Sequence, residues 1–191
     1  MAKQVAGLEQ LLLQELQDLF DAEKQRVRVL PRMAKQATDD ELENALREHL
    51  EVTRSQVQRL EQVFESMDHR ARSRPCRGMK GIVEEGREMM DEPREEAAVD
   101  SAIAGSARKA GHYEIATYEI ARSLARHLGR RDAAQLLQQA LREEMQADRT
   151  LARISSRLAA ETPGPERAAA RKAPGRRVPS AAARRRARGR G

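Results

Sequence analysis

Five polar side chains in this 191-residue sequence interrupt stripes of apolar residues that recur at helical spacing. The clearest case is Glu114, in the run His112-Tyr113-Glu114-Ile115-Ala116-Thr117-Tyr118, because the other positions on its stripe are small, apolar or a hydroxyl. The stripe advances in alternating steps of four and three residues, the spacing of a helix that faces a bundle core. A carboxylate on such a face is costly unless it is paired, protonated or bound to a metal. The five candidates are Glu23, His49, Glu114, Glu144 and Asp148.

These residue types match a dinuclear iron or manganese site inside a helical bundle. Such a site takes inward carboxylates, usually with histidines, from four helices, and oxygen and imidazole ligands suit Fe, Mn or Zn. Two ions about 3.5–4 Å apart need bridging carboxylates, and Glu23 and Glu114 are the bridge candidates. Glu144, Asp148 and His49 would complete the ligand set. The alternative is a structural polar layer without metal, and the sequence leaves both interpretations open.

The elements that must position these side chains are helices. Ala, Leu, Glu, Gln and Arg dominate the composition, which favours helix almost everywhere, and no alternating run of β-branched and aromatic residues predicts a strand. The predicted helices cover about residues 5–37, 39–67, 78–91, 95–128 and 131–160. Thr38 and Glu41 have the form of a capping box that starts the second helix. We take the inward stripe of the first helix to continue from Glu23 to Val27, and that of the second from Thr53 to Val57.

Two helical hairpins with tight turns, joined by a long connection that contains the short helix 78–91, have the topology of a ferritin-like four-helix bundle. We therefore predict an all-α, ferritin-like bundle over residues 1–161 with one short crossover helix. The single cysteine, Cys76, excludes an internal disulfide framework and a cysteine-cluster zinc site. No apolar run approaches the roughly 18–20 residues of a membrane span, and the N-terminus lacks a signal-peptide pattern, so a cytoplasmic protein is expected.

The charge of the chain is divided unevenly. Residues 162–191 contain 10 Lys and Arg and one acid, a net charge of +9, whereas residues 1–161 contain 26 basic and 29 acidic residues, a net charge of −3. We expect this Arg/Ala/Pro-rich tail to be disordered. It could bind nucleic acid without sequence preference by neutralising phosphates, or it could be only a solubilising extension. The arginines concerned are Arg184, Arg185, Arg186, Arg188 and Arg190.

Several segments resemble the YciE/YciF family of ferritin-like bacterial stress proteins over roughly residues 8–158. The matching segments are Asp21-Ala-Glu-Lys-Gln25, His49-Leu50-Glu51 with Thr53, Arg59-Leu-Glu-Gln-Val-Phe64, His112-Tyr-Glu-Ile-Ala116 with Tyr118, and Glu143-Glu144 with Asp148. The resemblance implies a ferritin-like bundle, commonly a homodimer, with a dinuclear site whose ligands fall on the five candidates above. This chain departs from the family pattern at Val52, Arg54 and Gln56, where further ligands are often found.

Three functions remain open from the sequence. The first is a metal-binding stress protein that holds iron or manganese and reacts with O₂ or peroxide. The second is a bundle that serves only as a scaffold while its basic tail binds nucleic acid, and the third is a dimeric structural or adaptor protein without chemistry. The absence of a nucleophile elbow, a phosphate-binding glycine loop and a His-Glu-x-x-His motif argues against a hydrolase. Whether the protein catalyses any reaction is not determined by the sequence.

Overall fold

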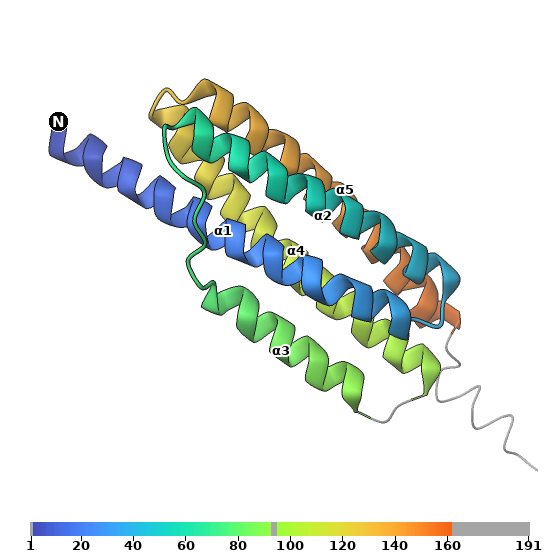
Figure 1. The fold of residues 1–191 in the computed structure, drawn as a ribbon. Coiled ribbons are helices and arrows are strands. Elements are labelled where there is room, and N and C mark those ends of the chain that lie inside the picture. The colour runs from blue at the N-terminus through green and yellow to red at the C-terminus, as the bar shows by residue number, and fades with distance from the viewer. Residues whose placement is uncertain (1, 93–94, 162–191) are drawn as a thin grey trace, which may run out of the picture. The chain divides into compact units, whose positions relative to one another are not determined.

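A computed structural model describes residues 2–92 and 95–161, with side-chain surroundings from residue 6 onward. Within these ranges the chain forms helices and no strands, as predicted. Four long helices lie side by side, and a short one flanks them (Figure 1). The helices are α1 (Ala2–Gln36), α2 (Asp40–Ser66), α3 (Arg77–Asp91), α4 (Glu96–His127) and α5 (Arg131–Glu161). This arrangement confirms the ferritin-like bundle with one short crossover helix.

The two tight turns follow from local chemistry, with one correction. Gly129, between α4 and α5, has a φ of 71°, a left-handed conformation that favours glycine and ends the helix. Between α1 and α2, the capping residue is Asp39 rather than Thr38, because the Asp39 carboxylate accepts a hydrogen bond from the Leu42 N–H. Thr38 has another partner: both its backbone N–H and its hydroxyl donate to Asp100 of α4.

The long connection brings α3 alongside α1 and α4 (Figure 1). Along this connection, the Arg74 N–H donates to the Gln17 carbonyl and the Cys76 N–H donates to Asp21, so both anchors are on α1. The Cys76 sulfur then accepts from the Met79 N–H at the start of α3. These bonds fix the end of the crossover against α1. The α3 helix therefore covers one side of the α1–α4 pair.

The core contains two large apolar clusters separated along the bundle, and a smaller third cluster where α3 packs against α1 and α4. One cluster includes Leu16, Leu60 and Leu141, and the other includes Leu30, Leu46 and Leu151. In α1, α2, α4 and α5, the residues between the two clusters in sequence include buried polar side chains. The polar layer formed by these side chains consists of Glu23, Arg26, His49, Thr53, Gln56, Glu114, Thr117 and Glu144.

The structure corrects the predicted inward stripe at two places within this layer. Arg26 and Gln56 are buried, at 1 % and 0 % exposure, whereas the predicted Val27 and Val57 are only half-buried. In both helices the inward positions keep the regular alternation of three and four, so the step after Glu23 and after Thr53 is three. The apolar character of Val27 and Val57 therefore does not override the regular helical spacing.

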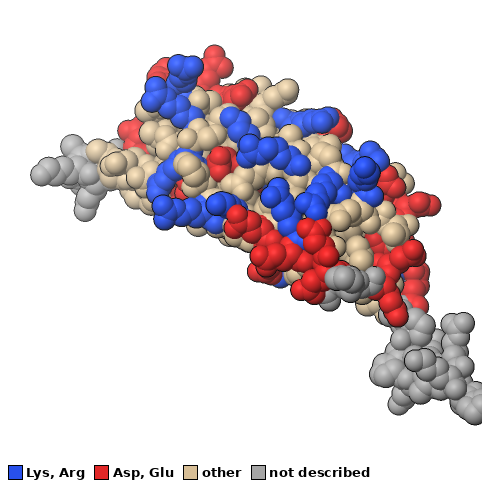
Figure 2. Space-filling model, turned by 60° about the horizontal axis from the view of Figure 1, so that its bottom comes forward, with Lys and Arg blue, Asp and Glu red and all other residues tan. Residues whose placement is uncertain are grey.

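No helix among the described residues is long and apolar enough to span a bilayer. Figure 2 shows lysine and arginine side chains spread over the upper and middle part of the visible face, whereas most of the acidic side chains gather along its lower right edge. The predicted tail, with its arginines from Arg184 to Arg190, lies outside the described residues.

Candidate metal centre

Three glutamates from three different helices meet in the middle of the bundle. Glu23 of α1, Glu114 of α4 and Glu144 of α5 each offer a carboxylate oxygen within 4.8 Å of the other two. Their exposed fractions are 0 %, 0 % and 1 %. Burial of three carboxylates without positive charge would be prohibitive, so the cluster needs protons or cations.

The cation present in the cluster is Arg26, a residue that is not among the five candidates predicted from the sequence. Its Nη1 lies 2.5 Å from Oε2 of Glu114 and 3.7 Å from Oε2 of Glu144. Burial disfavours the Arg26 cation, but Glu114 and Glu144 more than compensate and raise its pKa above the ordinary value. The signal in the sequence was its position three residues after Glu23, on the same face of the helix.

Tyr118 of α4 is a hydrogen-bond partner of Glu23. Its hydroxyl donates a 2.5 Å hydrogen bond to Oε1 of Glu23, and its ring is fully buried in the adjacent apolar cluster. The sequence pattern did not place Tyr118 among the candidate ligands. The structure adds that it orients Glu23 toward the cluster, which leaves Oε2 of Glu23 without a hydrogen-bond partner.

The surroundings shift the pKa values of the three carboxyl groups in one direction. Burial, together with the charge of Glu144, raises the pKa of Glu23 to about 8, although Tyr118 and Arg26 act against this rise. Burial also raises the pKa of Glu114 well above its ordinary value and raises the pKa of Glu144, with Arg26 opposing both shifts. Without a further cation, the cluster therefore retains protons that an exposed carboxyl group would have lost.

His49 of α2 stands next to the three glutamates. Its Nε2 lies 3.7 Å from Oε2 of Glu144, beyond hydrogen-bond distance, and neither of its ring nitrogens has a hydrogen-bond partner. Burial and the nearby Arg26 lower the pKa of His49 well below its ordinary value. The imidazole is therefore neutral at pH 7, which is the form that binds metals.

Asp148 is not part of this group. Its Oδ1 accepts a 2.8 Å hydrogen bond from Arg108 and lies 3.2 Å from Nε2 of His112, both on α4. The Asp148 side chain keeps 17 % of its surface exposed. Asp148 thus joins α5 to α4 at the boundary of the core, and the structure brings together four of the five predicted ligands, namely Glu23, His49, Glu114 and Glu144.

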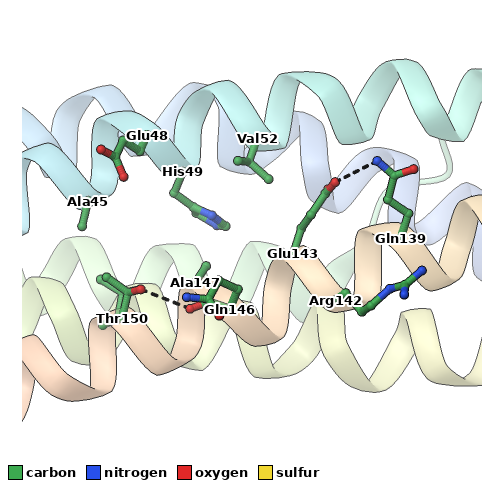
Figure 3. Close-up of a pocket in the computed structure, with 11 residues that line it drawn as sticks. Ala45, Glu48, His49, Val52, Gln139, Arg142, Glu143, Gln146, Ala147 and Thr150 are labelled. Carbon is green, nitrogen blue, oxygen red and sulfur yellow. Dashed lines mark hydrogen bonds between the residues drawn. The ribbon is translucent and has the colours of Figure 1, made fainter.

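A pocket of about 430 Å³ opens between α2 and α5 and has His49 on its wall (Figure 3). Its apolar lining includes Val52 of α2 and Leu151 of α5, and Figure 3 shows Glu143 reaching across to α2. Glu143 forms a bidentate ion pair with Arg59, whose Nη1 and Nη2 donate to its Oε2 and Oε1 at 2.7 and 3.0 Å. This pair lies beside the polar layer and ties α5 to α2. The pocket therefore provides a route from solvent to His49, at the edge of the carboxylate cluster.

The donor atoms fit a metal ion of the kind that oxygen and imidazole ligands bind. Among the described residues, buried ligand atoms without a well-formed hydrogen bond occur on all four side chains of the cluster. Such atoms are costly in a protein interior unless something binds them. Carboxylate oxygens with one neutral imidazole suit Fe, Mn or Zn. The atoms are Glu23 Oε2, Glu114 Oε1, both oxygens of Glu144 and both ring nitrogens of His49.

A family model, a curated protein and solved structures all match this chain. Residues 7–162 match the family described as "Domain of unknown function (DUF892)". Protein YciF of Escherichia coli strain K12 is 36 % identical over 142 residues, which are 74 % of this chain and 86 % of that protein. The crystal structure of the E. coli stress protein YciF superposes with a TM-score of 0.78 at 34 % identity, covering 81 % of this chain and 98 % of that one. YcfI from Rhodopseudomonas palustris superposes with a TM-score of 0.74 at 36 % identity, covering 75 % and 92 % of the two chains.

Proposed function

This chain belongs to the DUF892 family together with YciF, and on that premise we propose that it is a stress-response protein whose bundle binds divalent iron or manganese. Glu23, Glu114 and Glu144 would hold the ion, with His49 as the nitrogen ligand. The observation that carries this proposal is the convergence of three fully buried carboxylates on one point beside a neutral, unpartnered imidazole. A bound Fe or Mn ion supplies redox chemistry toward O₂ or peroxide. The E. coli relative is described as a stress protein, which supports the stress assignment.

The residues of this chain have separate tasks in the proposal. The carboxylates and His49 bind the ion, and Tyr118 orients Glu23 through its hydrogen bond. The apolar clusters on both sides exclude bulk water from the layer, while the pocket between α2 and α5 admits small molecules to the side of His49. A cytoplasmic location and a homodimer, both expected from the sequence analysis, remain predictions.

Elemental analysis of protein grown with iron and manganese tests the metal proposal. We expect bound Fe or Mn in the wild type and its loss in Glu114→Gln, since glutamine keeps the shape of the side chain but removes the anionic ligand. Glu119→Gln is the matched control, because Glu119 is exposed on the same helix. The metal content of Asp148→Asn tests whether Asp148, the fifth predicted ligand, contributes to metal binding. Metal-free wild-type protein, or equal metal content in Glu114→Gln, would favour the dimeric scaffold without chemistry.

The tail is proposed as a second, independent binding element. Residues 162–191 carry a net charge of +9 without an aromatic side chain, which suits phosphate contacts and not base stacking. We expect the full chain to retard duplex DNA in a gel, with affinity falling steeply with salt, and a chain ending at residue 161 to lose this retardation. The full chain with all ten tail cations changed to Gln controls for tail length. Equal retardation by the full and shortened chains would exclude a nucleic-acid role for the tail.

A further inference from the structure

We propose that the guanidinium of Arg26 takes the place of a second metal ion, so that the polar layer holds a single divalent ion instead of a dinuclear pair. This inference rests on the proposed function, because it concerns how many ions the carboxylate cluster accepts. It also reduces the number of bound ions from the two predicted from the sequence to one. The proposal follows from where Arg26 lies, from the charge of the layer and from the number of donors.

Arg26 lies among the atoms that a metal pair would need. Its Nη1 contacts Oε2 of Glu114 at 2.5 Å and approaches Oε2 of Glu144 at 3.7 Å. It therefore bridges glutamates of α4 and α5 from α1, as a shared metal ion would do. An arginine cannot give up its charge at any pH that a protein survives, and its fixed cation repels a second cation at this short distance in a buried site.

The charges of the layer balance with one ion and not with two. Three ionised glutamates contribute −3, Arg26 contributes +1 and neutral His49 contributes nothing. One divalent ion brings the sum to zero, and a second would leave +2 at the centre of the bundle. An uncompensated buried charge is strongly destabilising, so the layer is complete with Arg26 and one ion.

The remaining donors also suffice for only one ion. A dinuclear site in this kind of bundle uses four glutamates and two histidines, whereas the described layer presents three glutamates and one histidine. Asp148 is engaged by Arg108 and His112 instead. On α2, the residue one turn after His49 is Val52, a half-buried apolar side chain on the wall of the pocket. Among the four long helices, α2 is therefore the one that supplies no acid to the cluster.

Manganese titration tests the proposal with a reading that does not depend on activity. Metal-free protein is titrated with Mn²⁺, bound ions are counted by elemental analysis, and electron paramagnetic resonance separates an isolated ion from an exchange-coupled pair. We expect about one isolated Mn²⁺ per chain in the wild type and about two coupled ions in the double variant Arg26→Met, Val52→Glu. Methionine removes the charge with an unbranched side chain, and the new glutamate adds the missing carboxylate from α2.

Two controls separate charge from fold. Arg26→Lys keeps a cation in the layer and is expected to bind one ion, and Arg26→Met with Val52→Gln lacks the added carboxylate and is also expected to bind one. Circular dichroism confirms that each variant is helical before titration. A coupled pair in the wild type, or a single ion in the Arg26→Met, Val52→Glu variant, overturns the role of Arg26 and leaves the proposed function standing. No ion in the wild type, with binding in the Arg26→Met, Val52→Gln variant, overturns both the proposed function and the single-ion site, because Arg26 then excludes metal altogether. No ion in any variant overturns both.

Discussion

Metal-free protein is expected to lose stability as the pH rises from about 4.5 to about 8, the opposite of ordinary acid denaturation. Glu23 has an ordinary pKa of 4.5 when unfolded and a pKa of about 8 in the fold. Between these values the folded protein binds the extra proton, so the free energy of unfolding falls with rising pH by about 1.4 kcal/mol per pH unit for each such proton. Glu114 and Glu144 shift in the same direction and add to the slope.

Urea unfolding of chelator-treated protein at several pH values measures this slope. Glu23→Gln should flatten it, because glutamine has no proton to lose, while saturating Mn²⁺ should reverse it, since metal binds the deprotonated carboxylates. Carboxyl groups nearer the surface affect the stability in a different pH range. The pKa of Asp39 is lowered by its hydrogen bond to Arg157, so its contribution disappears only as the pH falls below about 4. Stability of the metal-free wild type that stays constant or rises between pH 5 and 8 would contradict the protonated cluster.

Replacing Arg26 by methionine is expected to destabilise the metal-free protein by about 3–5 kcal/mol at pH 8, the cost of breaking a buried ion pair. Glu114 would lose the 2.5 Å partner that offsets its burial. At pH 5 the cost should be smaller, because the glutamates can take up protons instead of remaining as unpaired anions. The difference between the two pH values distinguishes lost charge from lost packing, which does not depend on pH.

The matched control is Arg47→Met. Arg47 forms an exposed ion pair with Glu43 one turn earlier on α2, at 2.6 Å, and such a pair contributes roughly 0–1 kcal/mol. Chemical unfolding of both variants at pH 5 and pH 8 gives the comparison. An Arg26→Met protein as stable as Arg47→Met at pH 8 would mean that the glutamates do not depend on the guanidinium.

The presence of a polar layer and its supporting helices could be predicted from the sequence. Apolar residues at steps of three and four specify helices. Because the segments at 37–39 and 128–130 are short, the helices on either side of each must form an antiparallel hairpin. Glu23, Glu114 and Glu144 stood out for the same reason: an acid on an apolar stripe is visible without coordinates. The resemblance to the YciE/YciF family is confirmed by the match to the DUF892 family and to YciF.

The tertiary structure decided which polar side chains share the layer and how they are paired. Positions three and four residues after Glu23 both lie near the inward side of a helix. The regular alternation of steps favours Arg26, whereas the preference for an apolar side chain on a buried stripe favours Val27, and the sequence does not show which preference prevails. Arg26 points inward because Glu114, 88 residues later in the chain, offsets the cost of burying its charge. Asp148 turns away for the corresponding reason, since Arg108 and His112 are nearer partners. Pairing of buried charges depends on contacts between distant helices, and those contacts exist only once the bundle is assembled.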